Sequence, residues 1–239
     1  MKKLLIIIVL IGLSIKSQSQ TIPLFFEQSN EFFKNHVSAD GKVDYAKLKK
    51  SPGELMYILD NISKIPTQFE DKNASKAFWI NVYNLQVIKN VIDNYPLKAV
   101  TDVPTFFKEI NFMVGNQELT LDDIENTILR EIFTDAGIHF VLCSASNGGA
   151  QLLNAAYLPE NVESLMKQRA KLYLNTKNVI MVDKASRVVE LPKIFEWYKK
   201  DFVTTYFNEI DFINLFLEKK IENTLKIQTY DYNWTLNER

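Results

Sequence analysis

The sequence predicts an α+β fold, a helix-rich single domain around a small, mostly antiparallel sheet. Apolar residues recur at helical spacing over long stretches, whereas two hairpin patterns and two short apolar runs indicate strands. No repeat, low-complexity tract or Pro/Gly-rich linker divides the chain. Hydrophobic residues form 46% of the 239 positions, which is enough to bury a core.

The first 20 residues have the pattern of a signal peptide. Two lysines precede the apolar run 4–13, and the small residues Ser17 and Ser19 precede a predicted cut near Gln20. The apolar run is shorter than the roughly 20 residues that a spanning helix needs. We therefore expect an exported protein, periplasmic or secreted, whose domain covers residues 21–239 without a stable membrane anchor after cleavage. An uncleaved N-terminal anchor is the alternative.

The composition excludes several classes of site and partner. The net charge of -1 carries no basic excess, so neither nucleic acid nor anionic lipid is expected as a partner. Cys143 is the only cysteine, which rules out an internal disulfide. The two histidines, His36 and His139, lie far apart and form no metal-ligand spacing with it. No metal and no cofactor are predicted.

Helical patterns dominate the first half. Four phenylalanines at helical spacing predict a helix over residues 24–37, and a turn follows at 38–42. Ser51, Pro52 and Glu54 match an N-cap, a proline at the first helical position and a capping-box acid, so a helix is expected to run to about residue 62.

The longest predicted helix covers residues 74–94. It is expected to begin at Asn73 or Ser75, and Pro96 ends it. Asn81 and Asn84 interrupt its apolar pattern, and mid-helix asparagine is mildly unfavourable. We expect both to hydrogen-bond neighbouring backbone, with contact to a ligand as the alternative.

The second half mixes strands and helices. A hairpin over 110–114 and 118–121 is predicted from the Gly-Asn turn, and the residues from Thr120 to Asp123 are expected to cap a helix to residue 132. The apolar run 138–143 predicts a buried central strand. Periodicity then predicts helices over 150–157, 160–175, 192–202 and 207–220, a hairpin over 179–182 and 187–191, and a short strand over 225–229.

The segment 138–149 is the first candidate site. A small-residue loop over 144–149 follows the predicted strand, and a loop before a helix N-terminus leaves backbone N–H groups free for an anion or oxyanion. Ser144 is a nucleophile type and His139 a base type. The residues predicted to contact a ligand are Cys143, Ser146, Asn147, Gly148 and Gly149.

Each of these residues also has a structural interpretation. On a straight strand His139 and Cys143 would lie about 13 Å apart, too far for a local dyad. His139 can be a hydrogen-bonded core residue, and Cys143 an inert buried thiol. Glu125, in the first turn of a helix, either interacts with the helix dipole or orients a catalytic histidine.

Six stretches resemble the family called domain of unknown function 547 (DUF 547). They are Val43–Leu48, Ala77–Asn84, Leu119–Glu125, Ile138–Leu142, Ile194–Tyr198 with Asp201-Phe202, and Tyr230–Asn237. The Phe-Trp-Ile-Asn-x-Tyr-Asn motif within Ala77–Asn84 is the most specific of them. The resemblance implies a cysteine-hydrolase-like scaffold that uses a Glu, a His and a Cys.

The chain departs from that pattern at both cysteine positions. Glu125 and His139 match, but the first family Cys is replaced by Ser144, and the family's Gly-Cys-Pro is replaced by Gly148-Gly149-Ala150. A serine hydroxyl is not ionised at neutral pH and needs a well-placed base.

The sequence therefore leaves three hypotheses. The first is a non-catalytic protein that holds a small molecule or peptide near the Ser144–Gly149 loop. The second is a hydrolase or acyltransferase that uses Ser144 with His139 and Glu125. The third is a structural component of the cell envelope.

Overall fold

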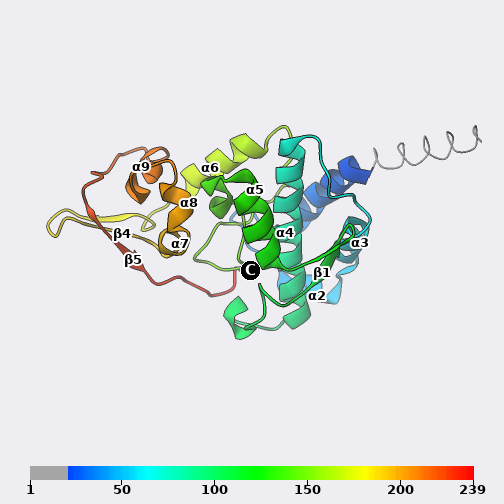
Figure 1. The fold of residues 1–239 in the computed structure, drawn as a ribbon. Helices are drawn as coiled ribbons and strands as arrows, with labels where there is room; N and C mark the ends of the chain where they lie inside the picture. Colours follow the sequence, from blue (N-terminus) through cyan, green and yellow to red (C-terminus); the bar gives the residue numbers. More distant parts are fainter. Residues whose placement is uncertain (1–20) are drawn as a thin grey trace, which may run out of the picture.

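The computed structural model describes residues 21–239, and the predicted signal peptide lies outside this range. The fold is α+β, as predicted (Figure 1). The helical elements are a first helix over residues 21–36, α2 Tyr45–Lys50, α3 Gly53–Ile62, α4 Lys72–Asn94, η1 Val100–Asp102, η2 Asp123–Arg130, α5 Glu131–Phe133, η3 Ala136–Phe140, α6 Val162–Leu174, α7 Ile194–Trp197, α8 Lys199–Val203 and α9 Glu209–Asn214. The strands are β1 Phe112–Val114, β2 Gln117–Leu119, β3 Met181–Asp183, β4 Val188–Pro192 and β5 Lys226–Tyr230. Across residues 21–239, no helix combines the length and hydropathy that a membrane crossing requires.

Helix α4 is the central element of the first half of the fold. Its side chains are buried around most of its circumference, and α2, α3, η2 and α6 pack against it (Figure 1). The helix begins earlier than predicted, because the Asp71 side chain accepts hydrogen bonds from the backbone N–H groups of Asn73 and Ala74. Lys76 on α4 pairs with both Asp135 and Glu163, which ties the helix to η3 and α6.

The helix predicted from residue 51 is present, but its predicted cap is wrong. Ser51 ends α2, where its N–H bonds to carbonyls of that helix, so it is not placed to cap α3. Pro52 precedes α3 without a side-chain cap, and Glu54 bonds His36 at 2.8 Å.

Both predicted hairpins are confirmed, and so is the Thr120 cap. Strands β1 and β2 pair antiparallel, as do β3 and β4, whereas β5 lies parallel to β4. Thr120 and Asp123 exchange hydrogen bonds between side chain and backbone in both directions, which is a capping box. The helix that follows is π-helical over η2.

Two predicted elements are replaced by irregular structure that α4 holds in place. Residues 138–143 form no strand, because η3 is a short 3₁₀ helix and Asn84 binds both the Val141 carbonyl and the Cys143 N–H at 2.9 Å. Residues 150–157 form no helix, because Asn81 binds both the carbonyl and the N–H of Tyr157. The structural role expected of the two asparagines is confirmed, and they supply the backbone partners that a sheet or helix would otherwise provide.

The helix predicted over 207–220 is shorter in the structure. Asn208 caps α9 through the Asp211 N–H. Asn214 then binds both the N–H and the carbonyl of Ile221, which turns the chain back and ends the helix.

Two hydrophobic clusters meet at η3. The first surrounds α4 and includes Ile138 and Val141, whereas the second is formed by α6, β4 and α7–α9 and includes Phe140. His139 therefore lies at the junction between the clusters.

The chain after β5 returns from the three-stranded sheet to the middle of the molecule (Figure 1). There it runs beside the 144–149 loop: Asn147 and Gly148 donate backbone hydrogen bonds to Thr235 and Asn233, and Asn237 donates one to Ala145. The C-terminal segment over residues 231–239 thus completes the region around His139.

Candidate functional site

His139 is fixed by a carboxylate that the sequence reasoning did not assign. Its Nε2 lies 2.8 Å from Oδ2 of Asp201 on α8, and Arg130 on η2 binds both oxygens of the same carboxylate at 2.6 and 3.0 Å. Partial burial would raise the pKa of Asp201, but the His139 and Arg130 contacts outweigh it and hold that pKa well below its usual range. The Asp201 side chain therefore orients the imidazole.

Tyr198 holds the imidazole from its face. The two rings stack with centroids 4.0 Å apart, and the Arg130 guanidinium lies 4.9 Å from the centre of the Tyr198 ring. Burial, followed by the nearby Glu125 carboxylate, raises the pKa of the Tyr198 phenol. The histidine side chain is 2% exposed, so its position is set by packing as well as by the hydrogen bond to Asp201.

Glu125 does not orient His139. The Tyr83 hydroxyl donates to Glu125 Oε2 at 3.2 Å, and the carboxylate of Asp201 occupies the place beside the imidazole. The prediction that Glu125 holds His139 in a triad is therefore corrected, since the orienting carboxylate comes from α8 rather than from η2.

Ser144 belongs to a closed ring of three hydroxyl groups. Its Oγ lies 2.7 Å from Ser146 Oγ and 2.8 Å from Tyr232 Oη, and Ser146 donates to Tyr232 at 3.0 Å. Within residues 21–239, His139 makes no hydrogen bond to Ser144. The hydroxyl proton of Ser144 is thus shared with two other hydroxyls instead of a base.

Two N–H groups of the 144–149 loop are already bonded within the protein. Its Asn147 and Gly148 N–H groups are bound to carbonyls of the C-terminal segment, and no helix follows the loop. The helix N-terminus on which the anion or oxyanion site was predicted is therefore not formed.

Two glycines of this loop allow the C-terminal segment to approach closely. A Cβ on Gly148 would lie 2.7 Å from the Asn233 backbone nitrogen, and a Cβ on Gly149 would overlap Tyr232 Oη and lie 3.1 Å from Ser144 Oγ. The Tyr232 hydroxyl thus occupies the space that any side chain at position 149 would fill.

Cys143 is a buried residue of the first cluster. It is 2% exposed, lines neither of the two cavities described below, and its Sγ accepts a 3.6 Å contact from Asn237. Burial raises the pKa of the thiol to about 11. This geometry agrees with the prediction of an inert buried thiol. It does not agree with the prediction that Cys143 contacts a ligand.

The three predicted catalytic residues line the same cavity, the larger of the two. It measures about 520 Å³, and Ser144, His139 and Glu125 all line it, together with Gly149. Its remaining walls are mainly aromatic and polar: Tyr83, Phe107, Lys108, Asp122, Asn126, Leu142, Ala150, Ile194, Trp197, Tyr198, Tyr232 and Trp234. Shape and chemistry make this the candidate site.

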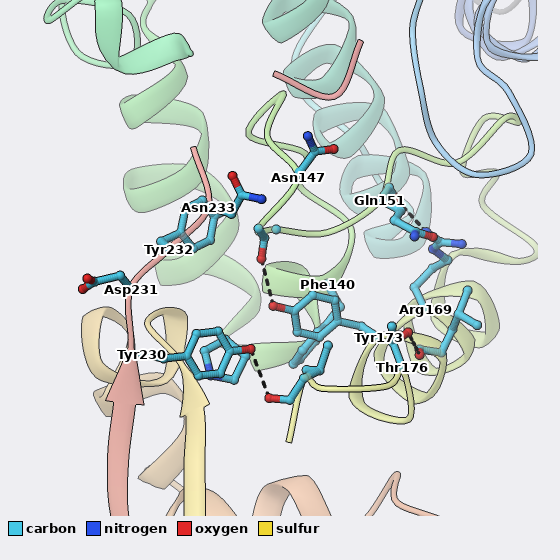
Figure 2. A pocket seen from close by; sticks show the side chains of 15 residues that line it. Phe140, Asn147, Gln151, Arg169, Tyr173, Thr176, Tyr230, Asp231, Tyr232 and Asn233 are labelled. Carbon is cyan, nitrogen blue, oxygen red and sulfur yellow. Dashed lines mark hydrogen bonds between the residues drawn. The ribbon is translucent and has the colours of Figure 1, made fainter. Parts of the chain in front are cut away.

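A smaller cavity lies on the other side of the contact between Gly149 and Tyr232. It measures about 220 Å³ and contains three of the predicted ligand-contact residues, Asn147, Gly148 and Gly149. Figure 2 shows how Tyr173 reaches the Gly148 carbonyl, to which it donates at 3.1 Å. Ser146 lines neither cavity, because its hydroxyl is buried in the ring with Ser144. The predicted site residues are thus divided between two cavities, except Cys143 and Ser146, which line neither.

Comparison with known proteins identifies the family. Residues 66–174 match the family model described as "Protein of unknown function, DUF547". This match supports the assignment of the chain to the DUF547 family. None of the curated proteins and none of the solved structures matches it.

The family assignment made from the sequence is thereby confirmed. The matched region contains Glu125, His139 and Ser144, whereas Asp201 and Tyr232 lie beyond it. The described residues contain no cluster of three or more side chains suited to a metal ion.

Sequence reasoning missed the residues that the second half of the chain contributes. Asp201, Tyr198 and Tyr232 come from α8, its preceding residue and the C-terminal segment. All three lie in stretches that resemble the family, and this resemblance was the one sequence feature that could have indicated them. Nothing in local spacing connects them with His139.

Proposed function

We propose that this DUF547 protein is an exported, non-catalytic binding protein that holds a small ligand or peptide side chain in the larger cavity. The main support is that Ser144 and His139 are each bonded to other groups. The Ser144 hydroxyl is hydrogen-bonded to Ser146 and Tyr232, and His139 is hydrogen-bonded to Asp201. A nucleophile and its base need a hydrogen bond between them, and these two groups have other partners.

The positions where the family carries thiols support the same proposal. Ser144 stands at one position, and at the other the Tyr232 hydroxyl fills the space beside Gly149. Cys143 does not replace them, because its thiol is buried with a raised pKa. The scaffold of a thiol hydrolase would thus be retained as a binding cavity.

Export rests on the first 20 residues, with their basic start and short apolar run. The site does not depend on it.

The binding function is tested by a thermal-shift screen of small molecules of mixed charge and polarity. A ligand at about 100 times its Kd stabilises the folded state by about 2.7 kcal/mol, which is readily measured. Trp234→Ala, in the cavity wall, is expected to abolish the shift, whereas Tyr57→Ala, an exposed aromatic on α3, is expected to retain it. Equal shifts in both variants would place binding elsewhere.

A hydrolase that uses Ser144 is the second candidate, favoured by the fact that Ser144 and His139 line the same cavity. A serine-reactive fluorophosphonate probe separates the two functions. We expect the wild type and Ser144→Ala to be labelled equally. Labelling that disappears in Ser144→Ala would establish the nucleophile and refute the non-catalytic function.

A further inference from the structure

The larger cavity contains acidic groups without basic partners. Glu125 and Asp122 both line it, and among residues 21–239 neither forms an ion pair. Arg130 lies near enough to interact with the Glu125 charge, but its hydrogen bonds go to Asp201 and Asn126. Lys108 is the only lysine or arginine of the lining.

The Glu125 carboxylate is oriented rather than neutralised. The Tyr83 hydroxyl donates to it at 3.2 Å, and the second phenol, Tyr198, lies close enough for the carboxylate to raise its pKa. Phenols fix the carboxylate direction but carry no positive charge, so Glu125 has no ion-pair partner among residues 21–239. An entering group that carries positive charge would supply the missing partner.

Three aromatic rings stand together in the same cavity wall. The ring centroids of Trp197 and Tyr232 are 5.2 Å apart, those of Trp197 and Trp234 are 5.7 Å apart, and those of Tyr232 and Trp234 are 4.5 Å apart. Trp197 is 45% exposed although it is a large apolar side chain. Indole and phenol faces attract cations, and tryptophan does so most strongly.

We propose that this cavity binds an organic cation, an ammonium or guanidinium group on a small apolar body, between the Glu125 carboxylate and the rings of Trp197 and Trp234. The inference rests on the proposed binding function and names the ligand class. Two carboxylates against one lysine disfavour an anion. A neutral polyol would contact the rings but would leave Glu125 without an ion-pair partner, and the test must separate this outcome from cation binding.

Choline and its neutral isostere 3,3-dimethyl-1-butanol are the probes, because they share shape and differ in charge. Binding is measured by calorimetry and by tryptophan fluorescence of the protein. We expect choline to bind at least about tenfold more tightly than the alcohol, a difference of about 1.4 kcal/mol. Butylamine and argininamide extend the series to primary ammonium and guanidinium groups.

Variants assign the charge effect to one carboxylate. Glu125→Gln keeps an acceptor for Tyr83 but removes the charge, and we expect it to weaken choline binding about tenfold while binding of the alcohol is unchanged. Glu118→Gln, on the exposed strand β2, removes the same charge outside the cavity and is expected to bind choline as the wild type does.

The outcomes distinguish a failure of the cation inference from a failure of the proposed binding function. Equal affinity for choline and the alcohol, or no binding of any cation in the series, would overturn the cation inference. The mixed-ligand screen would then still decide the binding function, because a neutral ligand lost in Trp234→Ala would uphold that function on its own. Tighter binding of choline that is unaffected by Glu125→Gln would overturn the assigned site.

Discussion

At the scale of single residues, the site is organised around one carboxylate. Asp201 binds both the imidazole of His139 and the guanidinium of Arg130, and it is about a fifth exposed (21%). A carboxylate with two such partners favours its charged form, which is why its pKa lies below its usual range. Its contribution to folding must therefore depend on pH.

We predict that Asp201→Asn destabilises the protein by about 1–3 kcal/mol at neutral pH, because Arg130 loses its charged partner. Since the folded-state pKa of Asp201 is lowered, this stabilisation is complete above the unfolded-state value of about 3.9 and is lost as the pH falls toward the folded-state pKa. Urea unfolding of both proteins from about pH 7 to about pH 3 should show the difference shrinking only below about pH 4. A constant difference over that range would contradict the role given to the Asp201 charge.

At the scale of elements, the 144–149 loop and the C-terminal segment form one unit. Backbone bonds join them from Ala145 to Gly148, and the hydroxyl ring joins Ser144 to Tyr232. The contact between Gly149 and Tyr232 separates the two cavities. The absence of a side chain at position 149 is what allows this separation.

We predict that Gly149→Ala destabilises the protein by about 1–3 kcal/mol, because the added methyl group overlaps Tyr232 Oη. Tyr232→Phe completes a double-mutant cycle with Gly149→Ala, because it removes the Oη atom. The ring carbon Cζ then lies 3.4 Å from the new methyl group, which is an ordinary contact. The double variant should therefore be more stable than the sum of the two single effects indicates, as measured by denaturant unfolding. Strict additivity would show that the clash is relieved elsewhere.

Sequence reasoning succeeded for elements whose signals are local. The long helix, both hairpins and the Thr120 cap follow from periodicity and turn residues. It failed for 138–143 and 150–157, where composition favours a strand and a helix but the partners are Asn84 and Asn81 of α4. A side chain that replaces a backbone partner leaves no pattern in the segment that it holds.

The same limit explains the prediction of the candidate site. The sequence predicted three residues with reactive side chains in stretches that resemble the family: His139, Ser144 and Glu125. All three line one cavity. Their partners were not found, since Asp201 is 62 positions from His139 and Tyr232 is 88 positions from Ser144. Contacts over such separations are set by how the two hydrophobic clusters pack.

At the scale of the whole molecule, Asn237 connects parts of the chain that are distant in sequence. Its backbone N–H binds Ala145 and its carbonyl accepts from Val43, while its buried side chain accepts from the Tyr45 hydroxyl at 2.6 Å and donates to the Gly41 carbonyl at 3.1 Å. The start of the domain, the 144–149 loop and the C-terminal segment therefore depend on one amide.

We predict that Asn237→Ala costs about 2–4 kcal/mol of unfolding free energy, because it leaves the buried Tyr45 hydroxyl and Gly41 carbonyl without partners. Tyr45→Phe removes the hydroxyl that Asn237→Ala leaves without a partner. The double variant should therefore lose less unfolding free energy than the two single variants lose combined. Hydrogen exchange should also rise in residues 143–149 of Asn237→Ala, and it should stay near the wild-type rate in Tyr45→Phe, which keeps the amide. If exchange in that loop were unchanged, the C-terminal segment would be held by its backbone bonds alone, and the order of the candidate site would not depend on the asparagine side chain.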